Sequence, residues 1–340
     1  MKIVVLAGGL SPEREVSLTS GSLIANALIE NGHRVLLLDV YEGLPDLSTD
    51  PDSLFQTSLY PIHKVCEQVP NLDELRARCQ NGNALIGANV LRLCMMADKT
   101  FLALHGSMGE NGQLQATLDT HGIRYTGSGY LGSAVAMDKD LSKRLMCHAG
   151  VNTPPWIYFD VQNGNRAEIL GKIGLPAVVK PCDCGSSVGV SIVENEQALY
   201  DALDEAAKWG RFVLVEKKIT GRELTVGVLG GKALPSVEIL PPDDGFYDYK
   251  NKYQGTTREI CPAEIPREVE ENAAALSLRA FDALRLSGYA RFDFMLDAKN
   301  RLWCLEANSL PGMTPTSLLP QAAAAVGISY RELCEKIVTL

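Results

Sequence analysis

The chain has 340 residues, more than the roughly 250–300 at which a single hydrophobic core stops growing, so we expect two or three domains. Hydrophobic residues make up 46% and charged residues 21%, which excludes a disordered or fibrous protein. Asp and Glu number 41 against 32 Lys and Arg, and this net charge of −9 argues against a nucleic-acid or anionic-membrane partner. No apolar stretch is long enough to span a bilayer, so we expect a cytoplasmic protein.

The N-terminal part predicts a βαβ opening. Residues 2–6 form an apolar, β-branched run, residues 17–31 have a helical pattern that ends at Gly32, and residues 35–38 form a second apolar run. Residues 43–98 have a weaker pattern, with one helix expected over 89–96. We interpret them as an elaboration of the first domain, without assigned chemistry. Strands over 100–104 and 123–126 complete this domain near Gly127.

The remainder predicts two further units. A helix over 139–148 and short strands over 156–159, 177–180, 188–193 and 212–216 indicate a small α+β unit. Longer strands, a helical pattern over 266–286 and a C-terminal helix pair follow. The nine cysteines lack paired metal-ligand spacing and are interpreted as reduced thiols; Cys182 and Cys184, the one close pair, leave metal or redox chemistry as a minor alternative.

Residues 289–308 have the most informative pattern, two alternating runs around Lys299-Asn300. If these two residues are the loop of a tight hairpin, Asp293 faces Glu306 and Arg291 faces Asn308. The opposite, apolar face then pairs Phe292, Phe294 and Leu296 with Ala307, Leu305 and Trp303. Facing carboxylates repel unless a cation lies between them, so Asp293, Glu306 and Asn308 predict a Mg²⁺ or Mn²⁺ site completed by nucleotide phosphates. The alternative is a solvent-facing strand with ordinary charges.

A second candidate is Lys180 together with the small-residue loop 185–189, which lies between two predicted strands. Such a loop can fold over phosphates, with backbone N–H groups and hydroxyls facing the anion and the lysine supplying charge. The alternative is an ordinary turn.

Three weaker signals lie in or next to the first domain. Gly127–Gly132 matches G-x-G-x-x-G, but it does not follow the first strand of the chain, where a dinucleotide fingerprint belongs. Glu15 lies at the start of the first helix. Its carboxylate could bind an ammonium group, or the helix dipole could simply stabilise it there. His105 follows a strand and begins a glycine-rich loop, as a site residue or a structural one.

In chain order these motifs resemble those of the D-alanine–D-alanine ligases of the ATP-grasp superfamily, over essentially the whole chain except residues 43–98. The matching segments are Ala7–Ser17, His105-Gly106 with Gly109–Gly112, Tyr125–Gly129, Met137–Lys139, Lys180-Pro181 with Gly185–Gly189, Glu216-Lys217, Phe246–Tyr249 with Lys252-Tyr253, Cys261–Ala263, Arg291–Asp293, and Glu306–Asn308 with Pro311–Thr314. Each motif alone is weak, whereas the ordered series is specific.

The resemblance implies an α/β and α+β fold: a Rossmann-like N-terminal, pre-ATP-grasp domain (1–127), then a two-lobed ATP-grasp fold with a central lobe (128–216) and a C-terminal lobe (217–340). It implies that ATP phosphorylates the carboxylate of one D-alanine and that the amine of a second attacks the D-alanyl phosphate. The product, D-alanyl-D-alanine, serves peptidoglycan synthesis. ATP, two Mg²⁺ or Mn²⁺ ions, D-alanine and a homodimer are implied as cofactors and partners.

Residue roles also follow from the resemblance. The phosphates would contact Lys139, Lys180, Ser186, Ser187 and Lys252; the adenine would contact Glu216, Lys217 and Ile219; the ribose would contact Glu223; and the metals would contact Asp293, Glu306 and Asn308. Lys218 departs from the family pattern, because an aromatic or apolar residue often packs on adenine there.

For the amino acids, the resemblance implies that Glu15 binds the ammonium group of the first D-alanine and that His105 lies in the substrate site. Arg291 and the Gly312 N–H would hold the oxyanion, and Ser317 with the Leu318 backbone would hold the second carboxylate. Tyr253 would close the site by bonding towards Glu15 and Ser186, and as a tyrosine it favours an amino acid over D-lactate as second substrate. The alternatives are a related ligase using D-serine or D-lactate, and a nucleotide-binding regulator without turnover.

Overall fold

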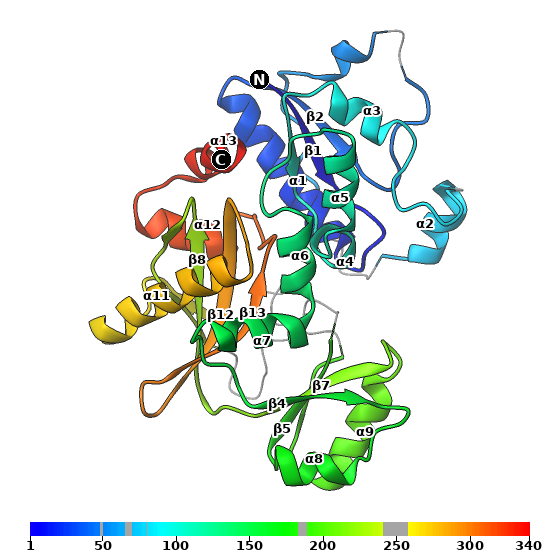
Figure 1. The fold of residues 1–340 in the computed structure, drawn as a ribbon. Coiled ribbons are helices and arrows are strands. Elements are labelled where there is room, and N and C mark those ends of the chain that lie inside the picture. The colour runs from blue at the N-terminus through cyan, green and yellow to red at the C-terminus, as the bar shows by residue number, and fades with distance from the viewer. Residues whose placement is uncertain (48–49, 65–69, 80, 183–188, 241–257) are drawn as a thin grey trace.

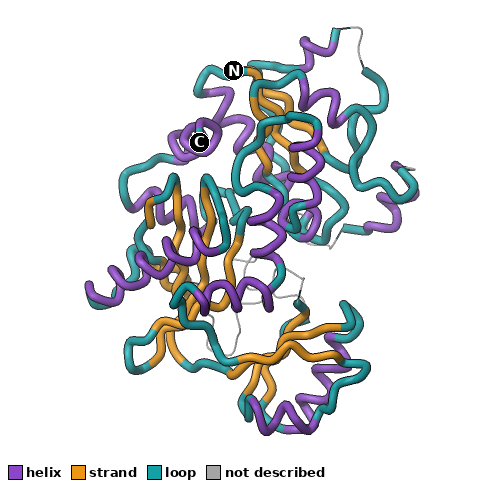
Figure 2. The backbone as a smooth tube through the Cα atoms, viewed as in Figure 1, coloured by secondary structure: helices purple, strands orange, loops and turns teal. Residues whose placement is uncertain are grey.

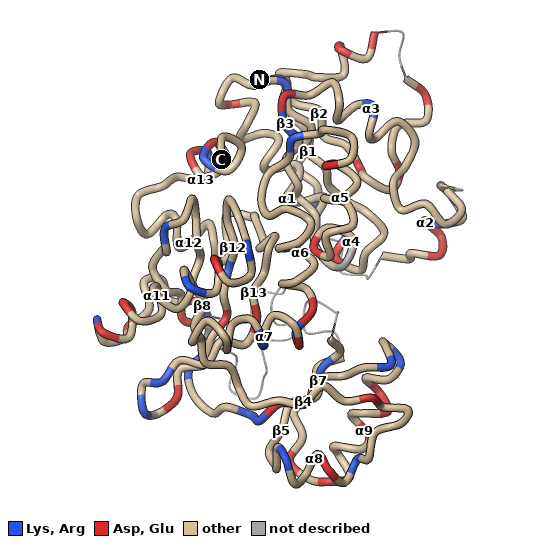
Figure 3. Tube along the Cα trace, viewed as in Figure 1, with Lys and Arg blue, Asp and Glu red and all other residues tan. Residues whose placement is uncertain are grey.

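The computed structural model describes residues 1–47, 50–64, 70–79, 81–182, 189–240 and 258–340, arranged as three lobes (Figure 1). Each lobe contains one sheet, and the three sheets are separate in space (Figure 2). Basic and acidic positions are interspersed over all three lobes (Figure 3). No helix among the described residues is long and apolar enough to cross a membrane, and no disulfide joins the described cysteines.

The N-terminal lobe is built on a parallel sheet of order β2-β1-β3, formed by β1 (Lys2–Ala7), β2 (Arg34–Asp39) and β3 (Lys99–Leu102). Residues 3–7 of β1 are fully buried, as the continuous apolar run predicts for a central parallel strand. Helix α1 (Arg14–Glu30) begins three residues earlier than predicted, because the Arg14 N–H already bonds the Ser11 carbonyl. The predicted strand 123–126 is wrong in extent: only an isolated bridge joins Tyr125 to Thr100.

The elaboration between β2 and β3 contains the 3-10 helix η1 (Pro51–Leu54), α2 (Leu72–Cys79) and α3 (Val90–Met95). The helix expected over 89–96 is confirmed by α3, whereas α2 was not predicted. Gln56 forms an isolated antiparallel bridge with Val35, which covers the outer edge of β2. After β3 follow the short α4 (Ser107–Glu110) and α5 (Gln113–Thr120).

The central lobe has an antiparallel sheet of order β4-β7-β5-β6. Its strands are β4 (Trp156–Asp160), β5 (Ala177–Pro181), β6 (Ser191–Val193) and β7 (Phe212–Lys217), and α8 (Ala167–Lys172) and α9 (Glu196–Ala206) share one core with it. These strands confirm the predicted ones. β6 begins later than expected, because Gly189 has a positive φ of 71° and lies in a turn.

The C-terminal lobe has a sheet of order β11-β10-β8-β12-β13, with β9 paired to β8. The strands are β8 (Gly221–Leu229), β9 (Lys232–Ala233), β10 (Val237–Leu240), β11 (Arg258–Ile260), β12 (Tyr289–Asp297) and β13 (Leu302–Asn308). Its core also contains residues of α11 (Arg267–Ala283), α6 (Tyr130–Met137) and α7 (Lys139–His148). The last two helices fall within the predicted central segment 128–216 but pack against the C-terminal sheet.

The final helices α12 (Leu318–Ala325) and α13 (Tyr330–Thr339) share a core with the N-terminal lobe and confirm the predicted pair. At the surface, Arg331 bonds the Glu30 carbonyl and the Asn31 side chain at the end of α1. The C-terminal helices therefore connect the C-terminal sheet to the N-terminal lobe, and both chain ends lie close to this junction (Figure 1).

The β12–β13 hairpin corrects one detail of the prediction. Its loop is one residue longer than expected, because Asp297 pairs with Arg301 and Asn300 takes a left-handed φ of 58°. Near the turn Phe294 therefore faces Cys304, and the predicted pairing with Leu305 is wrong. A bulge after Asp293 leaves Leu305 unpaired and restores the predicted register beyond it. The core face on this hairpin consequently uses Leu302 and Cys304 in place of Trp303 and Leu305.

Candidate active site

The predicted metal-binding carboxylates lie opposite each other on β12 and β13. Asp293 faces Glu306 and Arg291 faces Asn308, which confirms the predicted register. Asp293 Oδ1 accepts bonds from Arg291 Nε (2.9 Å) and Thr225 Oγ1 (2.6 Å), and Oδ2 accepts from Arg291 Nη2 (2.8 Å) and Asn308 Nδ2 (3.0 Å). Arg291 and Asp293 are both buried, so a bidentate, charge-assisted pair holds them in one geometry.

A cluster of lysines lies beside this hairpin, with Lys139 and Lys143 on α7 and Lys180 on β5 of the central lobe. Lys180 Nζ on β5 lies 2.5 Å from Glu216 Oε1, and Lys143 Nζ on α7 lies 2.9 Å from Glu216 Oε2. Lys139 Nζ lies 3.7 Å from Glu306 Oε2. The structure therefore brings the predicted residues Lys139, Lys180, Glu216 and Glu306 together.

Electrostatics in this cluster are set by burial and by the shared carboxylate. Burial raises the pKa of Glu216, but Lys143 and Lys180 together outweigh that effect and hold it below its usual range. Burial lowers the pKa of Lys143. Burial also opposes the charge on Lys180, yet the pKa of Lys180 is raised because Glu216 and Glu306 act on it.

Lys143 is a site residue that the sequence interpretation missed. It is 0% exposed, and its Nζ lies 5.2 Å from the centre of the Trp156 ring. The available signal was its position four residues after Lys139 on one helix, because residues four apart share a face. A buried lysine on the same face as a predicted phosphate ligand points into the same cluster.

The chain between the lobes fixes where α7 starts. The Asp138 side chain caps the helix by accepting from the Leu141 N–H, and the Lys139 N–H bonds the Cys182 carbonyl at the end of β5. Lys139 therefore begins its helix directly beside the strand that carries Lys180.

The predicted adenine and ribose residues follow this cluster along the chain. Lys217 is exposed at the end of β7, Ile219 is half-buried in the connection to β8, and Glu223 lies on β8. Lys218 Nζ lies 3.8 Å from Glu194 Oε1, so its charge is directed towards a surface carboxylate. Glu223 acts electrostatically on Lys180, which places it near the same lysine cluster.

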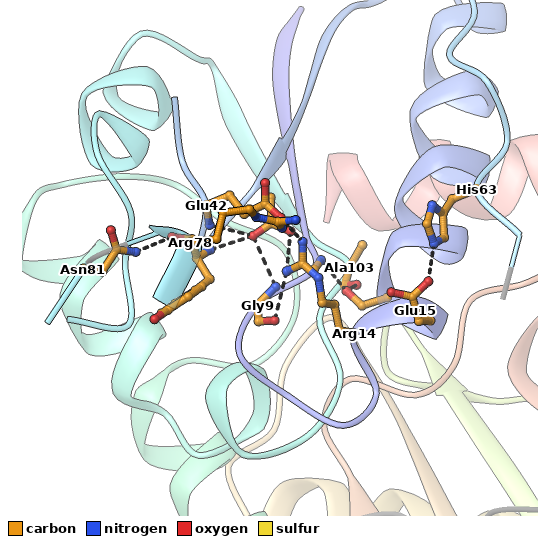
Figure 4. A network of polar contacts seen from close by, with 12 residues as sticks. Gly9, Arg14, Glu15, Glu42, His63, Arg78, Asn81 and Ala103 are labelled. Carbon is orange, nitrogen blue, oxygen red and sulfur yellow. Dashed lines mark hydrogen bonds and ion pairs between the residues drawn. The ribbon is translucent and has the colours of Figure 1, made fainter. Parts of the chain in front are cut away.

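The N-terminal lobe contributes the first turn of α1. The Gly8 N–H donates to Ser17 Oγ, and that hydroxyl donates to the Ala103 carbonyl, so the turn is tied to the carboxyl ends of β1 and β3. In open α/β sheets this edge is where ligands bind. Glu15 lies in this turn with His63 Nε2 2.6 Å from its Oε2 (Figure 4).

An ionic network holds the loop before Glu15. Arg14 is buried, with Nη1 2.7 Å from Asp39 Oδ2 and Nη2 2.5 Å from Glu42 Oε1. Arg78 from α2 contacts the same oxygen of Glu42 at 2.5 Å (Figure 4). Gly8 has φ +72°, and a Cβ there would lie 1.8 Å from Asp39 Oδ2, so glycine is required for this close approach.

His105 is buried in the connection between β3 and α4. Its Nε2 lies 3.4 Å from Ser20 Oγ on α1. Glu110, the last residue of α4, accepts a bond from the Gly106 N–H. Desolvation of this carboxyl and the nearby Glu13 raise the pKa of Glu110 to about 8, although Arg291 acts in the opposite direction. Glu110 therefore lies near both Glu13 before α1 and Arg291 on the β12–β13 hairpin.

The C-terminal residues predicted for the amino acids also lie together. A Cβ on Gly312 would lie 2.9 Å from Ser317 Oγ, which shows that the two residues are adjacent. The Ser317 hydroxyl accepts from the Thr314 N–H at 3.1 Å. Leu318 is the first residue of α12, so its N–H has no acceptor within the helix and is available to an anion.

Four predicted residues, Ser186, Ser187, Lys252 and Tyr253, lie outside the described residues, as does Cys184. Their roles stay predictions. The G-x-G-x-x-G match has a different position from the dinucleotide fingerprint: Ser287 Oγ donates to the Gly127 carbonyl, so this turn joins the N-terminal lobe to the C-terminal sheet. This packing favours a structural interpretation of the motif.

Two family models match the chain, "D-ala D-ala ligase N-terminus" over residues 2–128 and "D-ala D-ala ligase C-terminus" over residues 145–339. The chain belongs to the D-alanine–D-alanine ligase family. A D-alanine–D-alanine ligase of Pediococcus pentosaceus is 42% identical over 99% of this chain and 97% of that protein. One of Bordetella petrii is 40% identical over 99% and 91%.

Solved structures agree with this assignment. The D-alanine–D-alanine ligase of Bacillus anthracis complexed with ATP superposes with a TM-score of 0.77 and 30% identity, covering 100% of this chain and 96% of that chain. The VanG D-Ala:D-Ser ligase of Enterococcus faecalis has a TM-score of 0.78 at 27% identity, with coverage of 100% and 98%. The fold is therefore ATP-grasp, and membership of this family makes the chain an ATP-dependent ligase.

Proposed function

We propose that this site joins two D-alanine molecules into D-alanyl-D-alanine through a D-alanyl phosphate, and so supplies peptidoglycan synthesis. The observation that carries the proposal is the arrangement of Lys139, Lys180 and Glu306 beside Arg291. The two lysines would neutralise the transferred phosphoryl group, and Glu306 would bind a metal ion. Arg291 would stabilise the oxyanion that forms at the acyl carbon. A carboxylate reacts with an amine only after one of its oxygens becomes a good leaving group, and phosphoryl transfer depends mainly on positioning and charge neutralisation.

In the first step, Glu15 holds the ammonium group of one D-alanine, and a carboxylate oxygen of that D-alanine takes the γ-phosphoryl group from ATP, which releases ADP. Lys139 and Lys180 hold the nucleotide phosphates from two sides, with Glu216 keeping Lys180 in place. In the second step, the amine of the other D-alanine attacks the acyl carbon. Arg291 and the Gly312 N–H stabilise the oxyanion, and phosphate leaves.

We also infer a Mg²⁺ or Mn²⁺ site at Asp293, Glu306 and Asn308. The donors are oxygens, which hard divalent cations prefer. The described residues contain no group of three or more His, Cys, Asp or Glu side chains that could hold a metal. Mg²⁺ takes about six ligands, so three side chains would leave positions for nucleotide phosphates and water. When bound, the metal supplies charge neutralisation at the β- and γ-phosphates.

The remaining predictions extend this function. We infer that Glu216, Lys217, Ile219 and Glu223 contact the adenosine, and that Ser317 and the Leu318 N–H hold the carboxylate of the second D-alanine. Family membership further supports a cytoplasmic homodimer. The predicted domain boundaries after residues 127 and 216 stay a prediction.

The test is release of phosphate from ATP and Mg²⁺ with and without D-alanine, with product identity read by mass spectrometry. We expect D-alanine-dependent phosphate and the dipeptide, with D-serine and D-lactate as weaker second substrates in competition. Arg301→Ala, an exposed residue on the same hairpin, is a control that should retain activity. Folded protein that releases no phosphate in response to D-alanine would refute the proposal, and a dominant mixed product would reassign the second substrate.

A further inference from the structure

Helix α7 connects the central sheet with the core of the C-terminal lobe. At its start, the Lys139 N–H bonds the Cys182 carbonyl at 3.1 Å, directly after β5. One turn later, Lys143 Nζ lies 2.9 Å from Glu216 Oε2 on β7. Another turn along, Met146 is fully buried in the core of the C-terminal lobe. Lys143 therefore belongs to the contacts that fix α7 against the two strands carrying Lys180 and Glu216.

The Lys143 side chain is completely enclosed by protein. It is 0% exposed, its Nζ donates to the Pro154 carbonyl at 3.4 Å, and the Trp156 ring lies over it. The Lys180 side chain, at 9%, retains some exposure. Because protein atoms cover Lys143 on all sides, it does not reach a ligand itself. Any effect of Lys143 on a nucleotide passes through its neighbours.

Glu216 divides its two carboxylate oxygens between two lysines. Oε1 lies 2.5 Å from Lys180 Nζ, and Oε2 lies 2.9 Å from Lys143 Nζ. Two ammonium groups against one carboxylate leave one positive charge in excess. Lys180 is the member of this trio that also feels Glu306 on the β12–β13 hairpin, so the excess charge faces the predicted phosphate and metal positions.

We propose that Lys143 is a positioning residue for the nucleotide phosphates: it holds one oxygen of Glu216, so that Lys180 is bound through the other oxygen alone. This inference rests on the proposed role of Lys180. Without Lys143, both oxygens of Glu216 would be left to Lys180, and the two charges would cancel. An ammonium group has three N–H donors, and a two-point pair with Glu216 would leave fewer of them for a phosphate.

The experiment measures binding of ADP with Mg²⁺ by isothermal titration calorimetry, without D-alanine. Lys143→Met should raise the Kd for ADP about tenfold, the size of one charge-assisted bond. Adenosine, measured by its competition with ADP, has no phosphate, so its Kd should change less than about threefold. Lys172→Met, the same substitution in the exposed pair with Glu168, should match wild type for both ligands.

A double-mutant cycle tests whether Lys143 acts through the carboxylate of Glu216. Once Glu216→Gln has removed that carboxylate, adding Lys143→Met should change the Kd for ADP by less than about twofold. The double variant removes both charges of one buried pair together, so it remains informative even where Lys143→Met alone does not fold. Melting temperatures confirm folding of each variant.

Three results would overturn the inference. The first is an ADP Kd within about twofold of wild type in folded Lys143→Met. The second is an equal loss for ADP and adenosine, which would indicate a general distortion of the site. The third is a further loss of about tenfold on adding Lys143→Met to Glu216→Gln. Phosphate release by the wild type with D-alanine tests the proposed function separately, because ADP binding requires no D-alanine.

Discussion

Arg291 and Asp293, two residues apart on β12, form a buried two-point ion pair with N–O distances of 2.8 and 2.9 Å. One is the predicted oxyanion residue and the other a predicted metal ligand. Each charge neutralises the other in a buried position. The proposed ligation of a metal by Asp293 therefore requires that Asp293 exchange at least one of its present hydrogen-bond partners.

This relationship predicts the effect of Arg291→Ala. Removal of the arginine should lower kcat by about 10²–10³-fold, the usual loss when one oxyanion donor is removed. Arg291→Lys should recover only part of the rate, because an ammonium group cannot make the two parallel bonds. Steady-state phosphate release measures both, with Arg301→Ala as the matched control. A kcat within threefold of wild type for Arg291→Ala would contradict the assigned role.

The facing carboxylates predict a metal dependence. Glu306→Gln should raise the Mg²⁺ concentration for half-maximal rate by about tenfold or more, because it removes a charged oxygen ligand. Excess EDTA should abolish turnover of the wild type, and Mn²⁺ should restore it. Asp282→Asn on the exposed side of α11 is the control for a lost negative charge. An identical Mg²⁺ titration for Glu306→Gln and wild type would remove Glu306 from the ligand set.

Lys143 predicts a stability effect. Lys143→Met keeps most of the side-chain volume but leaves Glu216 with Lys180 as its counterion, and loss of one partner of a buried pair costs about 3 kcal/mol. Lys172→Met breaks the exposed pair with Glu168 and should leave the unfolding midpoint close to that of wild type, because exposed ion pairs contribute little to stability. Urea unfolding followed by circular dichroism compares the two. Equal midpoints would show that the buried pair adds no stability.

Glu110 predicts a pH dependence of stability. Its pKa of about 8 in the folded protein exceeds the usual value of 4.5, so the folded state binds the proton more tightly. Its favourable contribution is complete below about pH 4.5 and is lost as the pH rises through 8. Glu110→Gln should therefore gain melting temperature over wild type progressively between pH 5 and 8. The exposed Glu268→Gln should show no such trend; a constant difference for Glu110→Gln would contradict the raised pKa.

The β12–β13 hairpin shows how far a local sequence pattern predicts the positions of candidate site residues. Alternation placed Asp293 opposite Glu306 correctly, although the assumed loop was one residue too short. The left-handed Asn300 adds one residue at the turn, and the unpaired Leu305 adds one on β13, so the register agrees again at the acidic pair. The length of the loop and the position of the bulge depend on backbone conformations that the hydrophobic pattern does not encode.

Other features depend on contacts between distant segments. His63 reaches Glu15 through bonds from Asn26 and Ser22, in a segment without helical or strand periodicity. Lys143 carried no motif, and contacts of α7 with distant segments bury it beside Glu216 on β7 and under the Trp156 ring. Such side chains are placed by tertiary structure, whereas the motif residues on strands could be predicted from position alone.

The most direct test of the account uses D-alanine labelled with ¹⁸O in its carboxylate, with ATP and Mg²⁺, and measures the isotope content of the released phosphate. Activation of the carboxylate by phosphoryl transfer predicts one ¹⁸O atom in each phosphate, because the oxygen that bridges carbon and phosphorus leaves with the phosphoryl group. Unlabelled phosphate, released in a D-alanine-dependent reaction that forms the dipeptide, would contradict a D-alanyl phosphate intermediate in this site.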